Sequence, residues 1–146
     1  MKILVVEDDH LQRDWIRQQL QQELNAQIDV IKTELDFRSR LEEITKNPPD
    51  VIIMDIMLRW TDPNPAMEPQ PEDVKMEGFF RAGLRCEKLL ASDERTKNIP
   101  VILYTVLANS DLGDKIKKLG QNIFYVPKDS DIRPLARWIR GLVRRH

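Results

Sequence analysis

Short runs of apolar residues alternate along this chain with longer segments in which apolar residues recur every three or four positions. The short runs are continuously apolar, which is typical of strands that are buried on both faces of a parallel sheet. They span residues 2–6, 28–31, 51–54, 100–104 and 123–126. The segments with a helical period span residues 9–24, 33–46, 78–91, 111–119 and 131–143. Five strands that alternate with five helices predict a doubly wound α/β fold with helices on both faces.

The size and composition of the chain fit one folded domain. Its 146 residues are enough to bury a core without disulfides. The single cysteine, Cys86, excludes a disulfide bond within the chain. The formal net charge of -1 gives no global field that favours nucleic acid or a membrane surface. No apolar run approaches the ~20 residues of a membrane span. We therefore expect a single domain over 1–146, a cytoplasmic location, no direct nucleic-acid binding and no membrane insertion.

One segment interrupts the regular alternation. Residues 59–77 (RWTDPNPAMEPQPEDVKME) hold four of the nine prolines and five acidic residues against two basic ones. The segment has no helical or strand period, and it follows the third predicted strand. It fits either a solvated loop or a lid or partner-docking element, because long loops in compact domains are often functional.

Charged and hydroxyl side chains gather where the predicted strands end. Glu7 and Asp8 follow the first strand, Asp55 follows the third, Thr105 follows the fourth, and Lys128 follows the fifth. Taken singly, the acidic residues fit an ordinary helix cap or turn residue, and Thr105 and Lys128 indicate little. In a doubly wound sheet, however, the carboxyl ends of the strands line one binding crevice. Their joint placement therefore predicts one common site.

Asp55 raises a charge problem that this site would solve. An ionised carboxylate at the end of a buried strand is strongly disfavoured unless something pairs with it. Magnesium prefers carboxylates, water and phosphate oxygens as ligands. Mg²⁺ and Lys128 together would balance Glu7, Asp8 and Asp55. A carboxylate that is held ionised beside a metal and a cation can attack a phosphoryl group, which makes Asp55 a candidate nucleophile.

Four stretches of the chain resemble a known family. ILVVEDD, IIMDIML, VILYT and FYVPK are similar to the landmark motifs of response-regulator receiver domains of two-component signalling. The resemblance covers the chain from Lys2 to about Val143. It implies a flavodoxin-like five-stranded parallel sheet of order 2-1-3-4-5 and a Mg²⁺ or Mn²⁺ cofactor.

The resemblance also implies roles for particular residues. Asp55 matches the phosphoacceptor. The metal ligands that it implies are Glu7 (through water), Asp8, Asp55 and the backbone carbonyl of Met57. The residues that it implies for contact with the phosphoryl group or for switching are Thr105, Lys128 and Tyr125. An aromatic at position 125 equally fits packing of an edge strand against the last helix.

Three features depart from the family's pattern. Val106 stands where the family has a small residue, and we expect it to narrow access to Asp55 and to slow exchange of the phosphoryl group. Lys128 is followed by Asp129 instead of proline, which favours a trans peptide bond. A glycine that the family has soon after the phosphoacceptor matches Gly78, which comes 23 residues after Asp55.

Together these features predict a stand-alone response regulator or phosphorelay receiver. A sensor histidine kinase or histidine phosphotransfer protein would phosphorylate Asp55. We expect the output to be a contact with another protein or with a second copy of the chain, because no effector domain follows up to His146. Beyond self-catalysed phosphoryl acceptance and slow autodephosphorylation we expect no enzyme activity. A hydrolase would need an acid where Met57 stands. The alternative is a phosphorylation-independent adaptor that acts through residues 59–77 and the basic last helix.

Overall fold

The computed structural model of the chain describes residues 1–61, 70–78, 81–106 and 122–144, with the backbone alone at 76 and 77. Within these ranges five parallel strands form one sheet in the order β2-β1-β3-β4-β5. The strands are β1 (Lys2–Val6), β2 (Gln27–Ile31), β3 (Val51–Met54), β4 (Val101–Thr105) and β5 (Ile123–Pro127). The predicted fold class and strand order are confirmed, whereas the helix predicted over 111–119 lies outside the described residues.

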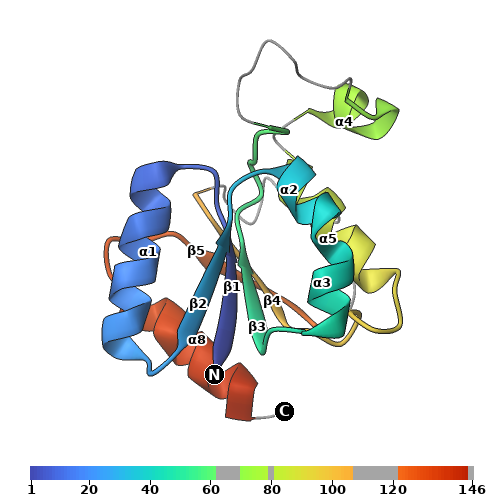
Figure 1. Cartoon of the computed structure of the whole chain (residues 1–146). Helices are drawn as coiled ribbons and strands as arrows, with labels where there is room; N and C mark the ends of the chain where they lie inside the picture. The colour runs from blue at the N-terminus through green and yellow to red at the C-terminus, as the bar shows by residue number, and fades with distance from the viewer. Residues whose placement is uncertain (62–69, 79–80, 107–121, 145–146) are drawn as a thin grey trace.

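Helices cover both faces of the sheet (Figure 1). One layer contains α1 (His10–Glu23) and α8 (Arg133–Arg144), and the other contains α2 (Glu34–Ser39), α3 (Leu41–Lys46) and α5 (Ala82–Ala91). Alternate residues of each strand point to opposite layers, so Ile3 packs in the core under α1 and α8 while Leu4 packs under α2, α3 and α5. Both faces are apolar, which explains the continuous hydrophobic runs. No helix in the described ranges is both long and apolar enough to cross a membrane.

The segment 33–46, which its period predicts as one helix, is divided into α2 and α3. Thr33 caps α2 as expected, because its hydroxyl accepts a hydrogen bond from the Asp36 amide at 3.1 Å. Arg40 interrupts the helical backbone with φ -100° and ψ 7°. Its guanidinium bonds to Asp29 on β2 and to Glu43 on α3. These bonds fix Arg40 at the junction, so the chain turns there.

The expectation that residues 59–77 contain no regular structure is wrong at their end. Residues Glu72–Glu77 form a short helix, α4, that lies beyond the carboxyl ends of the strands and apart from the two helical layers (Figure 1). Glu72 and Asp73 occupy its first turn, where acidic side chains favour the positive end of the helix dipole. Gly78 ends it with φ 74°, a left-handed conformation that glycine adopts without strain. The next helix therefore begins at Ala82 instead of residue 78.

Candidate functional site

The carboxyl ends of β1 and β3 place Glu7 and Asp55 side by side. Val6 pairs with Met54 in the parallel ladder, and the amide of Asp55 continues it by donating to the carbonyl of Val6 at 3.0 Å. The amide of Glu7 likewise donates to Ile31 of β2. Glu7 is 2% exposed and Asp55 is 6% exposed. Two carboxylates thus lie almost buried at one edge of the sheet, where the sequence predicts a site.

Lys128 joins these two carboxylates. Its ammonium nitrogen lies 2.9 Å from Oε1 of Glu7 and 2.9 Å from Oδ2 of Asp55. Its backbone amide donates to the carbonyl of Thr105 at 2.9 Å, which fixes the start of the loop after β5 against the end of β4. The Lys128–Asp129 peptide bond is trans, as the missing proline predicts. Residues from three strand ends therefore meet in one hydrogen-bonded cluster.

The cluster is short of positive charge. Burial and the neighbouring Asp55 raise the pKa of Glu7 well above its ordinary range, and Lys128 offsets this only in part. Burial acts to lower the pKa of Lys128, but Asp55 and Glu7 outweigh it and raise that pKa. Oε2 of Glu7 is buried, and no hydrogen-bond donor of the described residues lies within reach of it. Buried oxygens facing one cation suit a second cation with a preference for oxygen ligands, so the site fits Mg²⁺ or Mn²⁺.

Asp8 has a different partner. Its Oδ2 accepts a hydrogen bond from the backbone amide of Arg59 at 2.9 Å, and the Arg59 Nε lies 3.5 Å from the same oxygen. In the described ranges, no three acidic, histidine or cysteine side chains are grouped closely enough to act together as metal ligands. Lys128 therefore links Glu7 to Asp55, whereas Arg59 holds Asp8. The expected set of metal ligands remains a prediction.

The remaining predicted residues surround this cluster. Oδ1 of Asp55 accepts hydrogen bonds from the amides of Ile56 at 2.7 Å and Met57 at 3.4 Å, which orients its carboxylate. Thr105 is fully buried at the end of β4. Val106 is 69% exposed and lines a groove together with Leu11 and Lys128. It therefore borders the open side of the cluster.

Tyr125 does not pack against the last helix, the alternative that an aromatic at that position allows. It is half-buried on β5 and packs against the core under α2, α3 and α5. Its neighbour Phe124 points to the other face and meets Trp138 of α8, with ring centroids 5.5 Å apart. The alternation of side chains along a strand explains why one residue of this pair faces each layer.

Two residues that support the cluster are absent from the sequence prediction. A methyl group on Gly83 would overlap the carbonyl oxygen of Asp55, and the Gly83 amide donates to the carbonyl of Ile56 at 2.8 Å. Glycine at this position thus lets α5 approach the end of β3. Arg13 of α1 is buried and donates to the carbonyl of Glu7 at 3.1 Å, which braces the acidic loop after β1. Neither contact has a local sequence signal, because each depends on how a helix lies against the sheet.

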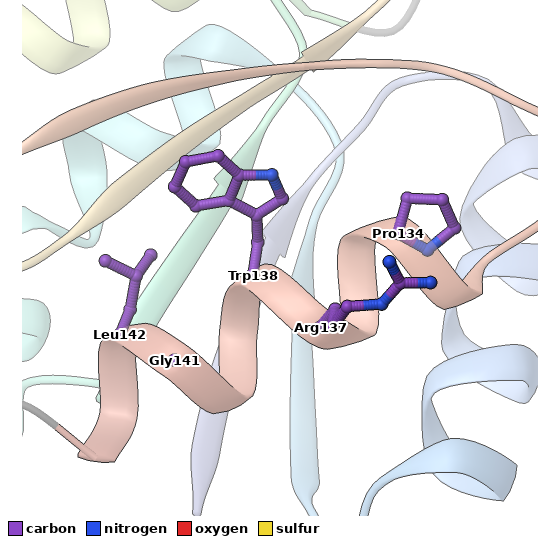
Figure 2. Close-up of a pocket in the computed structure, with 5 residues that line it drawn as sticks. All are labelled: Pro134, Arg137, Trp138, Gly141 and Leu142. Carbon is purple, nitrogen blue, oxygen red and sulfur yellow. The ribbon is translucent and has the colours of Figure 1, made fainter.

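A separate cavity of about 240 Å³ lies along α8 (Figure 2). The residues that line it are Pro134, Arg137, Trp138, Gly141 and Leu142. They follow one another at helical spacing on a single helix, and none of them belongs to the acidic cluster. This surface is part of the basic last helix that the adaptor interpretation invokes.

Comparison with known proteins places the fold. No family model matches the chain, and no curated protein matches it in sequence. Solved structures do match over almost its whole length. The signal receiver domain of a histidine kinase from Clostridium thermocellum has a TM-score of 0.72 and 17% identity, covering 98% of this chain and 97% of that one. The fold is therefore that of receiver domains of two-component signal transduction.

Two further neighbours carry functional detail of their own. The receiver domain of a sensor histidine kinase from Pseudomonas aeruginosa holds a magnesium ion in its active-site cleft; it has a TM-score of 0.67 and 19% identity, covering 98% of this chain and 97% of that one. The phosphorylated cyanobacterial phytochrome response regulator RcpA has a TM-score of 0.64 and 21% identity, covering 97% of this chain and 89% of that one.

Proposed function

We propose that this chain is a response regulator or phosphorelay receiver in which Asp55 accepts a phosphoryl group. The observation that supports this most directly is the ammonium group of Lys128, which bonds at 2.9 Å both to Glu7 and to Asp55 at the carboxyl edge of the sheet. A scaffold has no need for two nearly buried carboxylates around one lysine, because burying charge is costly. A site that receives an anionic phosphoryl group on a carboxylate needs a cation beside that carboxylate, and Lys128 supplies one at Asp55.

The donor would be a phosphohistidine of a sensor histidine kinase or of a histidine phosphotransfer protein. A carboxylate oxygen of Asp55 attacks the phosphorus, the bond from phosphorus to the histidine nitrogen breaks, and that nitrogen keeps the electron pair and takes up a proton. The product is an acyl phosphate on Asp55. Lys128 is already within bonding distance of Asp55 and would then pair with the added charge. Thr105 and Tyr125 would respond to that charge as switch residues.

Glu7, Asp8, Asp55 and the carbonyl of Met57 would hold the divalent ion. The ion, Mg²⁺ or Mn²⁺, supplies positive charge that offsets the phosphoryl oxygens and the carboxylates. Oε2 of Glu7, which is buried and accepts no hydrogen bond from the described residues, supports this assignment. The magnesium and the phosphorylated state of the two receiver-fold neighbours agree with it.

Phosphoryl transfer to Asp55 would be a signalling event without turnover of a separate substrate. We expect slow autodephosphorylation as the only further reaction, in a cytoplasmic protein. The downstream partner would be a protein that distinguishes the phosphorylated state from the free one, or a second copy of this chain.

Labelling tests the proposal. The purified chain is incubated with a small phosphoramidate donor and Mg²⁺, and the acyl phosphate is measured by intact mass. We expect one added phosphoryl group in the wild type and in Asp14→Asn, an exposed aspartate of α1. Asp55→Asn should give none, and removal of the metal by EDTA should abolish labelling. A label that persists in Asp55→Asn would refute the assignment of the phosphoacceptor.

The adaptor remains the second candidate because of the surface on α8. The cavity in Figure 2 lies beside the exposed Arg137. Charge on this helix is partly neutralised, however, since Arg133 pairs with Asp131 and Arg140 with Glu23. If neither a small donor nor a histidine kinase labels Asp55 under any metal condition, the adaptor is favoured.

A further inference from the structure

Arg59 lies at the junction between the acidic cluster and the long segment after β3. Its backbone amide and its side-chain Nε both approach Oδ2 of Asp8, at 2.9 Å and 3.5 Å. Asp8 is an expected metal ligand, so a cation that belongs to the protein already faces one of the carboxylates of the metal site. The backbone bond fixes the orientation of Asp8, whereas the guanidinium adds a positive charge beside it.

The backbone of Arg59 is anchored independently of Asp8. Its carbonyl accepts a hydrogen bond from the amide of Glu34 at 3.0 Å, and the carbonyl of Trp60 accepts one from the amide of Leu35 at 2.9 Å. These bonds tie residues 59 and 60 to the first turn of α2. The Arg59 side chain is half exposed, and these backbone bonds do not involve its guanidinium.

The anchor continues into α4. The guanidinium of Arg38 on α2 lies 5.4 Å from the centre of the Trp60 ring and bonds to Glu34 at 2.9 Å and to Asp73 of α4 at 3.1 Å. The segment that carries Arg59 is therefore held between the metal site and the short helix α4. A change in the partners of Asp8 therefore acts on Arg59, whose backbone is bonded to α2.

We propose that Arg59 is a positioning residue that sets the metal affinity of the site. Its guanidinium neutralises Asp8 before the divalent ion binds, and the ion has to displace it, because two cations compete for one carboxylate and repel each other. The affinity of the site is thus tuned by a residue outside the ligand set. This inference rests on the proposed function, since it takes Asp8 to be a metal ligand.

The test is the dissociation constant of Mg²⁺ alone, measured by calorimetry on the full chain without a phosphodonor. We expect Arg59→Ala to bind Mg²⁺ about two- to five-fold more tightly, the size expected for a partly exposed ion pair, with a smaller effect at high salt. Arg59→Lys should remain close to the wild type, because it keeps the charge and the backbone bond.

Arg95→Ala is the matched control. Its side chain is 53% exposed against 50% for Arg59, and it pairs with Asp93 and Glu42 away from the cluster. An unchanged or weaker affinity in Arg59→Ala, or an equal gain in Arg95→Ala, overturns the proposal while leaving the metal site intact. If the wild type itself binds no Mg²⁺, the metal site of the proposed function fails, and this inference fails with it.

Discussion

Gly83 of α5 lies so close to Asp55 that a side chain on Gly83 would overlap the carbonyl oxygen of Asp55. Helix α5, which follows the segment 59–77, thus packs directly on the backbone of the predicted phosphoacceptor. The hydrogen bond from Gly83 to Ile56 at 2.8 Å holds the same contact. The position of Asp55 therefore depends on a residue that has no functional group.

We predict that Gly83→Ala destabilises the chain by about 1–3 kcal/mol, the usual cost of an overpacked contact. Because the shift needed to admit the methyl group falls on residues 55 and 56, labelling of Asp55 should slow as well. Urea unfolding and the labelling rate measure the two effects. Gly141→Ala on α8 is the control, since no atom of the described residues lies within 4 Å of the added carbon. That variant should be neutral or more stable by about 0.5–1 kcal/mol. Equal behaviour of the two variants would contradict the overlap.

Glu34 and Arg85 form a buried, two-pronged ion pair between α2 and α5, with N–O distances of 2.9 and 2.6 Å. We predict that Glu34→Gln lowers the free energy of unfolding by about 3 kcal/mol, because it removes the buried negative charge that pairs with the guanidinium of Arg85. Glu42→Gln, which breaks the exposed pair with Arg95, should cost less than about 1 kcal/mol. Chemical unfolding measures the free energy of unfolding of both variants. Similar losses of this free energy in the two variants would show that burial of the Glu34–Arg85 pair is unimportant.

The sheet and the acidic cluster were predictable because each depends on a local signal. Continuous apolar runs such as residues 51–54 mark buried strands, and a parallel sheet brings the residues after those runs to one edge. This reasoning placed Glu7, Asp55 and Lys128 together, and their hydrogen bonds agree with it. Their chemical roles remain predictions.

Other features depend on contacts between distant parts of the chain and have no such signal. Glu34 and Arg85 are 51 residues apart, so nothing in either stretch identifies the partner. The helix Glu72–Glu77 is only six residues long, too short for a period to stand out among prolines. At Leu11 a local signal is present but misleading. The spacing of apolar residues on α1 suggests that Leu11 points inward, but it is exposed and lines the groove beside Lys128.

Glu87 makes stability depend on pH. It is 4% exposed, its Oε2 has no hydrogen-bond partner in the part of the chain that the structure describes, and burial raises the pKa of its carboxyl from 4.5 to about 7. The folded chain therefore holds this proton more tightly than the unfolded chain. Its contribution to stability is complete below about pH 4.5 and is lost as the pH rises through about 7.

We predict that Glu87→Gln removes this loss. The variant should match the wild type below about pH 4.5 and exceed it well above pH 7 by up to about 3 kcal/mol, since each unit of the pKa shift from 4.5 to about 7 corresponds to about 1.4 kcal/mol. Thermal unfolding at several pH values measures the difference. Glu94→Gln, an exposed acidic residue, is the control and should show no such dependence. A wild type and a Glu87→Gln variant with parallel pH profiles would exclude a buried, protonated Glu87.

Val106 borders the cluster where it opens to solvent. It lines a groove together with Lys128, which bonds to Asp55, so we expect its two methyl groups to narrow the approach of water to a phosphoryl group on Asp55. We predict that Val106→Ala shortens the lifetime of the acyl phosphate about threefold, which corresponds to less than about 1 kcal/mol of activation free energy. Labelling by small donors should become faster to a similar extent.

The control is Val143→Ala on α8, which removes the same two carbons away from the groove and should change neither rate. Loss of label followed by intact mass measures the lifetime. Because Val106 is exposed, Val106→Ala should fold, so an unchanged lifetime in this variant would mean that the groove wall does not control access to Asp55.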